Sequence, residues 1–133
     1  MNNYYDVSWI RNMNPTYSSN LCTPKDGYLK GNMFKDLYSP YKNYQPMILN
    51  PRSEKEKKFL ELSEVSFAAH ELNLYLDLHP DDQSMFLLFK DYQKKEKELK
   101  EEYESYYGPL CVDSEMNNFS WVSSEWPWEG NNV

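Results

Sequence analysis

The stretch from Glu71 to Leu110 constrains the fold of this chain most, because it contains a helix-breaking turn followed by a helix stop. The turn is His-Pro-Asp-Asp at 79–82. Pro80 would break a helix interior but fits a first helical turn, and the two aspartates put negative charge at the positive end of a new helix dipole. Gly108 and Pro109 predict the end of that helix. The pattern indicates two helices joined by a tight turn.

The first long helix is expected to begin after Ser53. Ser53 and Glu56 have the capping-box spacing, in which the serine accepts from a helix amide and the glutamate reaches back. Apolar residues then recur at alternating steps of three and four, which predicts one buried stripe. The stripe consists of Phe59, Leu62, Val65, Ala69, Leu72 and Leu76.

The second helix has the same alternation, typical of the seam of an antiparallel pair. The seam consists of Met85, Phe89, Tyr92, Glu96, Leu99, Tyr103 and Tyr106. Both helices are apolar on further sides near the turn, whereas two helices alone can shield only one stripe each. We therefore expect another cover for the hairpin: the N-terminal arm, a second hairpin that completes a four-helix bundle, or a different protein.

The flanking segments are rich in aromatic residues. Residues 1–50 form an arm rich in Tyr, Asn and Pro, in which Gly27–Tyr41 has apolar residues at helical steps and predicts a short helix. This segment either docks on a partner by its aromatic side chains or packs on its own hairpin. In the acidic tail, 110–133, the cluster of Trp121, Trp126 and Trp128 either folds back or anchors a partner. Residues 51–109 form the helical hairpin between them.

The composition and motifs exclude several function classes. A net charge of −7 argues against nucleic acids and anionic membranes as partners. A di-metal bundle site needs Glu three residues before His, but Phe67 precedes His70 and Leu76 precedes His79 at that spacing. No nucleophile or phosphate-loop motif is found, so we expect no catalytic residue, cofactor or metal. Two separated cysteines, at positions 22 and 111, are either free thiols or a disulfide.

From about Leu60 to Trp128 the chain resembles the CotJB family of bacterial spore coat proteins. The resemblance rests on ELNLYLDLHPDDQ, on FKDYQKKEKELKEEYESYYGPL and on the terminal WPWE, in this order and spacing. The segment Gly31–Tyr41, GNMFKDLYSPY, is also similar to the short coat protein CotJA. The chain thus resembles a CotJB protein that carries a CotJA-like segment in its arm.

This resemblance implies a structural component of the inner spore coat, made in the mother-cell cytosol. It also implies CotJA and CotJC, a manganese-catalase-like protein, as partners, and it assigns no catalytic residues. The fold expected is all-α: an antiparallel hairpin with an extended arm and tail, completed by oligomerisation or by a partner.

The first functional hypothesis is a non-catalytic coat assembly protein. Its expected contact residues are aromatic and apolar side chains of the arm and tail: Phe34, Leu37, Tyr38, Tyr41, Trp121, Trp126 and Trp128. A second hypothesis is an accessory subunit of the catalase-like enzyme, in which Glu64 or Glu71 approaches the metal of the partner. A third is a general helical adaptor.

Overall fold

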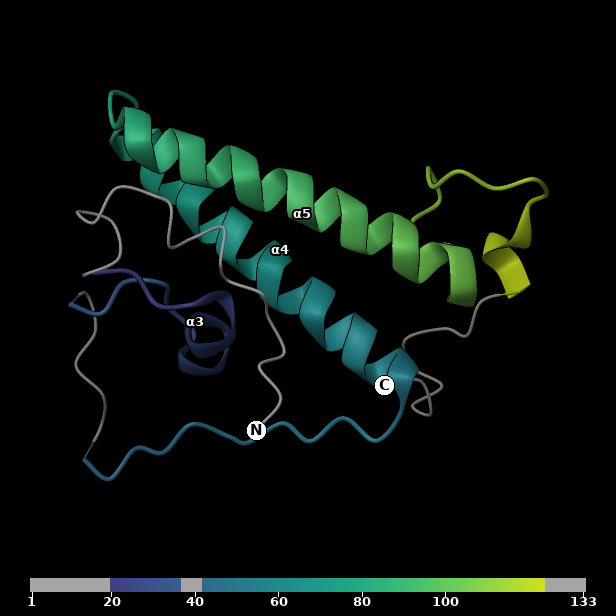
Figure 1. Ribbon diagram of the computed structural model, residues 1–133, viewed down its shortest axis with the longest axis horizontal. Coiled ribbons are helices and arrows are strands. Elements are labelled where there is room, and N and C mark those ends of the chain that lie inside the picture. Colours follow the sequence, from purple (N-terminus) through teal and green to yellow (C-terminus); the bar gives the residue numbers. More distant parts are fainter. Residues whose placement is uncertain (1–19, 37–41, 124–133) are drawn as a thin grey trace.

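The computed structural model describes residues 20–36 and 42–123, and this part of the chain is built from helices (Figure 1). A short helix, α3 (Pro24–Lys30), precedes two long ones, α4 (Glu54–Leu78) and α5 (Gln83–Tyr107). A turn of 3-10 helix, η1 (Ser120–Ser123), follows them. α4 lies in the middle and packs against both α5 and α3. The predicted all-α fold with two long helices is confirmed.

α4 begins where the capping pattern predicts. The Ser53 hydroxyl accepts a hydrogen bond from the Glu56 amide at 3.1 Å, and the Glu56 carboxylate accepts from the backbone N–H of Arg52. The glutamate thus reaches one residue further back than in the usual capping box. The bond to Ser53 pairs the Glu56 amide, which the helix start would otherwise leave without a partner, and the bond from Arg52 ties the preceding residue to the first turn.

Asp82 determines where α5 begins. One of its carboxylate oxygens accepts from the Met85 amide at 3.0 Å, and the other accepts from the Tyr75 hydroxyl at 2.9 Å. Because the Asp82 side chain takes the N-cap role, the helix begins at Gln83. Residues 79–82 form the turn between the helices, as the sequence predicts, and Pro80 lies in this turn and not in the first turn of α5.

Contacts at both ends of the hairpin fix α4 and α5 as an antiparallel pair. At the turn, Tyr75 bonds to Asp82, and at the far end the Phe59 and Tyr103 rings lie 5.6 Å apart. Between these ends lies the core, in which side chains from both predicted stripes are buried together with Ala68 and Leu88, which the predicted stripes do not include. The buried members are Leu62, Val65, Ala68, Ala69, Leu72, Met85, Leu88, Tyr92, Leu99 and Tyr103.

α5 ends at Gly108, as predicted. Gly108 has a φ of 95° and a ψ of 172°, and a positive φ of this size favours glycine. The Glu104 carboxylate then accepts from the Leu110 amide at 2.8 Å and from the Ser114 hydroxyl. One side chain of the last helical turn thereby holds the chain that leaves the hairpin.

Residues 20–36 fold into a loop that contains α3 and is closed by a β-bridge between its ends, and we call this segment the clasp. An isolated antiparallel bridge joins Leu21 to Phe34, with the Cys22 amide donating to the Met33 carbonyl at 2.8 Å. The prediction of a helix within Gly27–Tyr41 is wrong, because α3 begins earlier and ends at Lys30. Gly31, with a φ of 77°, reverses the chain there. Residues 37–41, with Leu37, Tyr38 and Tyr41, lie outside the described part.

The clasp packs on the hairpin through its own apolar side chains. Met33 is fully buried and Phe34 is 8% exposed. The Phe34 ring stacks on Tyr75 at 5.2 Å, and the Tyr28 ring meets Phe67 edge-on at 5.9 Å. For this part of the arm, packing on its own hairpin is therefore the alternative that the structure shows.

We predict that Asp82→Ala lowers the free energy of unfolding by about 1–3 kcal/mol, because it removes the cap of α5 and the partner of the Tyr75 hydroxyl. The neighbouring exposed Asp81 provides the matched control, and Asp81→Ala should change stability by less than about 0.5 kcal/mol. Urea unfolding followed by far-UV circular dichroism measures both. Equal losses in the two variants would contradict the assigned role of Asp82.

We also predict that Phe34→Ala destabilises the chain by about 3 kcal/mol if clasp and hairpin unfold together. Asp36→Ala, at an exposed clasp position, is the control. Thermal unfolding monitored by tryptophan fluorescence and by circular dichroism should give one shared transition for wild type. An unfolding temperature that Phe34→Ala leaves unchanged would show that the clasp does not belong to the cooperative core.

Candidate functional site

Four apolar side chains are exposed around the turn of the hairpin, and we call them the tip patch. They are Leu74 and Leu78 at the end of α4, and Phe86 and Leu87 at the start of α5. Their exposed fractions are 48%, 80%, 42% and 55% respectively. Each belongs to the sides of the helices that the seam leaves uncovered. The tip patch is thus the observed form of the excess apolar surface that the sequence predicts.

A groove continues the tip patch between the hairpin and the clasp. It has a volume of about 760 Å³. Leu74 and Leu78 of the patch line it, Phe34 contributes from the clasp, and Glu71 and Asp36 are among its polar residues. Leu74 and Leu78 belong to both the patch and the groove, and we call the patch and the groove together the tip surface. The lining of the groove combines apolar side chains with polar and acidic ones, as protein interfaces do.

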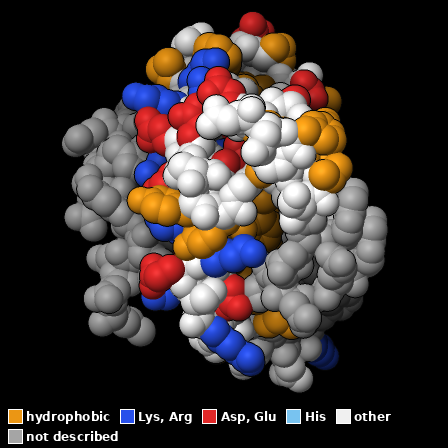
Figure 2. Space-filling view, turned by 90° about the vertical axis from the view of Figure 1, so that its right-hand side faces the viewer, with side chains coloured by type: hydrophobic (Ala, Val, Ile, Leu, Met, Phe, Trp, Pro, Cys, Tyr) orange, Lys and Arg blue, Asp and Glu red, His pale blue; other side chains and the backbone are white. Residues whose placement is uncertain are grey.

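The opposite end of the hairpin has a different character. Lys58 forms an ion pair with Glu102 and also lies 5.6 Å from the centre of the Tyr106 ring. Seen from this end, acidic and basic side chains are interspersed with the apolar ones (Figure 2). Lys97 and Glu101, 3.7 Å apart, add a further exposed pair on α5. The later half of α5 thus has charged side chains that are exposed to solvent.

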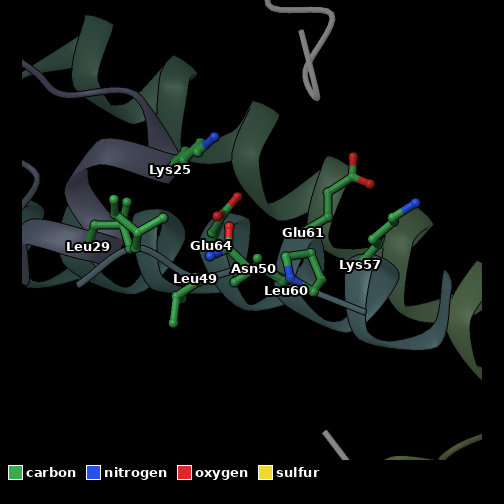
Figure 3. A pocket seen from close by; sticks show the side chains of 10 residues that line it. Lys25, Leu29, Leu49, Asn50, Lys57, Leu60, Glu61 and Glu64 are labelled. Carbon is green, nitrogen blue, oxygen red and sulfur yellow. The ribbon is translucent and has the colours of Figure 1, made fainter. Parts of the chain in front are cut away.

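A second cavity, of about 490 Å³, lies against the first half of α4 (Figure 3). Its walls come from α3, from the extended residues 48–51 and from α4. Glu64 lines it and is only 2% exposed. Burial raises the pKa of the Glu64 carboxyl to about 7. Burial also raises the pKa of Glu61, one turn earlier, against an opposing effect of Lys95.

The sequence-predicted contact residues are not brought together in the described part of the chain. Phe34 is buried against Tyr75 and lines the groove at the tip, while Trp121 is half-buried in η1, beyond the end of α5. Leu37, Tyr38, Tyr41, Trp126 and Trp128 lie outside the described residues. The four residues of the tip patch were not among the predicted contacts, although the all-round apolar sequence near the turn is the signal that identifies them.

Potential catalytic and metal-binding side chains are dispersed. In the described residues, no three or more His, Cys, Asp or Glu side chains are placed together to hold a metal ion. His70 is exposed on α4, and His79 follows the last residue of that helix. Cys22 and Cys111 are free thiols, each half-buried. No helix in the described part is long and apolar enough to cross a membrane.

The pKa of Glu64 generates a prediction about stability. Because the folded-state pKa of about 7 lies above the ordinary glutamate pKa of 4.5, the folded chain binds the proton more tightly than the unfolded chain. Between these values the contribution of Glu64 to stability falls as the pH rises. We predict that Glu64→Gln gains ~1–3 kcal/mol over wild type at about pH 8 and little at about pH 4.5.

Urea unfolding at both pH values measures this difference, with Glu71→Gln as the control on the same helix. A Glu64→Gln variant whose stability follows that of wild type at every pH would contradict the burial of an ionisable Glu64.

Comparison with known proteins gives one family. The family model described as CotJB protein matches residues 56–129, which contain α5, nearly all of α4 and η1. No curated protein and no solved structure matches the chain. The match covers more than half of the 133 residues, so the chain belongs to the CotJB family and is a protein of the spore coat.

Proposed function

We propose that this chain is a non-catalytic assembly component of the spore coat, which binds other coat proteins through the tip surface. The observation that carries the proposal is the tip patch, where four large apolar side chains are exposed and two of them also line the groove. Burial of one such side chain contributes about 1.5–3 kcal/mol, so an interface that covers the patch has a substantial driving force. Exposed apolar surface of this kind often marks a protein interaction site.

The expected partners are a manganese-catalase-like coat protein of the CotJC type and proteins of the CotJA type, in the inner layers of the coat. The family supports a role in the coat, and the packing of the clasp adds a structural argument. Met33 and Phe34 belong to the CotJA-like segment, and both are buried against the hairpin of the same chain. The hairpin therefore provides a surface on which a segment of this type can pack.

The aromatic residues of the arm and tail remain proposed secondary contacts. Trp121 is only half-buried, so part of its indole is available to a neighbour. Leu37, Tyr38 and Tyr41 follow the clasp directly in sequence, and Trp126 and Trp128 follow η1. In this proposal Trp121 belongs to a separate contact, because η1 lies at the end of the hairpin opposite the tip (Figure 1).

An accessory role for a catalase-like metalloenzyme is the second candidate, and the position of Glu71 favours it. Glu71 lines the groove of the tip surface, so a docked partner would meet its carboxylate. Glu64 is less suited to this role, because it lines a separate cavity between α3, residues 48–51 and α4 and not the groove of the tip surface. In this candidate function, Glu71→Gln changes the metal content or turnover of the bound partner. If the metal content and turnover of the partner stay unchanged, only the assembly role remains.

We predict that Leu78→Ser combined with Leu87→Ser weakens binding to the catalase-like coat protein at least about tenfold, because two apolar anchors are lost from the interface. The control is Val112→Ser combined with Phe119→Ser, since these apolar residues are 61% and 63% exposed but lie after α5. Co-expression, affinity purification and light scattering give the mass of the complex, and titration gives its affinity.

Equal losses in both double variants would contradict a specific tip interface. A stable homo-oligomer that leaves the partner unbound would contradict the partner assignment. If only the Leu78/Leu87 double variant lost this homo-oligomer, the tip contact would lie between copies of this chain.

A further inference from the structure

The cavity beside Glu64 is apolar along its walls and acidic in its interior. Leu29 from α3, Ile48 and Leu49 from the extended segment, and Leu60 from α4 provide aliphatic surface. In Figure 3 the Glu64 carboxylate extends from α4 toward the space between the labelled Lys25 and Glu61 side chains. The volume of about 490 Å³ falls within the range of ordinary ligand pockets, about 300–1,000 Å³.

Glu64 has unused hydrogen-bonding capacity in this cavity. Its Oε2 atom is buried and accepts no hydrogen bond from the described residues. A buried carboxylate without donors is unfavourable, and a cation that brings N–H groups would relieve the penalty. The side chain thus has the geometry of a binding group whose partner is supplied from outside.

The lysines around the cavity do not occupy the hydrogen-bonding position at the Glu64 carboxylate. Lys57, at the rim, bonds to Glu54 at 2.5 Å, and Lys95 of α5 acts on Glu61. Lys25 of α3 is exposed and also lines the rim. Desolvation accounts for the raised pKa of Glu64, and none of these lysines offsets it. The positive charges of the described residues therefore do not neutralise the buried carboxyl.

We propose that this cavity receives a lysine side chain of a neighbouring coat protein, with its methylene groups along the leucines and its ammonium group at the Glu64 carboxylate. Lysine suits the site because its stem is aliphatic and its compact head donates hydrogen bonds in three directions. A guanidinium group has five donors in a fixed plane and needs more acceptors than one free carboxylate oxygen. An apolar side chain would fill the walls but leave Glu64 without a donor.

That the lysine comes from a coat protein depends on the proposed assembly function. The affinity of the cavity for an alkylammonium group is independent of that function. The test therefore uses n-butylammonium and the full-length chain, without any partner. Methyl NMR spectra of leucine-labelled protein would follow Leu29, Leu49 and Leu60 during the titration. n-Butanol has the same apolar stem without charge and serves as the ligand control.

Wild type should bind n-butylammonium about tenfold more tightly at about pH 8 than at about pH 6, because the ionised fraction of a group with a pKa near 7 changes by this factor. Lys25, Lys57 and Lys95 stay charged over this interval, while Glu61 is the other acid at the cavity. Glu64→Gln should weaken binding about tenfold at the higher pH and abolish the pH dependence. Glu61→Gln, the matched control, should keep most of the affinity at the higher pH and most of the pH dependence.

Several results would overturn the inference. They are the absence of methyl shifts in wild type at both pH values, equal binding of n-butanol, and equal binding by Glu64→Gln. A response to Mg²⁺ in place of n-butylammonium would assign the cavity to a metal ion instead. None of these outcomes affects the tip surface, whose test depends on Leu78 and Leu87.

Discussion

The packing of α4 against α5 is the interaction on which the rest of this structure depends. Every other described element is positioned by it: the clasp lies on the outer side of α4, and the chain after α5 is held by Glu104. Because only one side of each long helix is used in the seam, α4 keeps a second side for the clasp. Near the turn, both helices have apolar residues left over for a neighbour.

The hairpin could be predicted because its signals are local and repetitive. Ser53, Asp82 and Gly108 mark helix ends through bonds to nearby amides or through their own backbone, and the seam repeats many times along each helix. The clasp could not be predicted in this way, because its decisive contacts join residues far apart in the sequence. Met33 and Phe34 fit a helical pattern with later residues, but Gly31 turns the chain and buries both against α4.

The candidate sites show the same division. The sequence shows more apolar residues near the turn than the seam can bury, and in the structure four of them are exposed. The burial of Glu64 is not visible, since a glutamate on an amphipathic helix is ordinarily solvated. It is covered by α3 and by residues 48–51, and the extended segment has no periodicity from which its position could be inferred. Family membership adds the setting of the spore coat, while the contacts identify the surfaces available there.

The two carboxylate oxygens of Asp82 have a consequence for communication within the molecule. One caps α5, and the other holds the Tyr75 hydroxyl, whose ring stacks on Phe34 of the clasp. The start of α5 and the closure of the clasp are therefore linked through a single side chain, beside the groove that both help to form. Thermodynamic linkage is reciprocal. A protein that binds the tip and favours this arrangement of Tyr75 also strengthens clasp closure, and a closed clasp raises the affinity of the tip for that protein by the same factor.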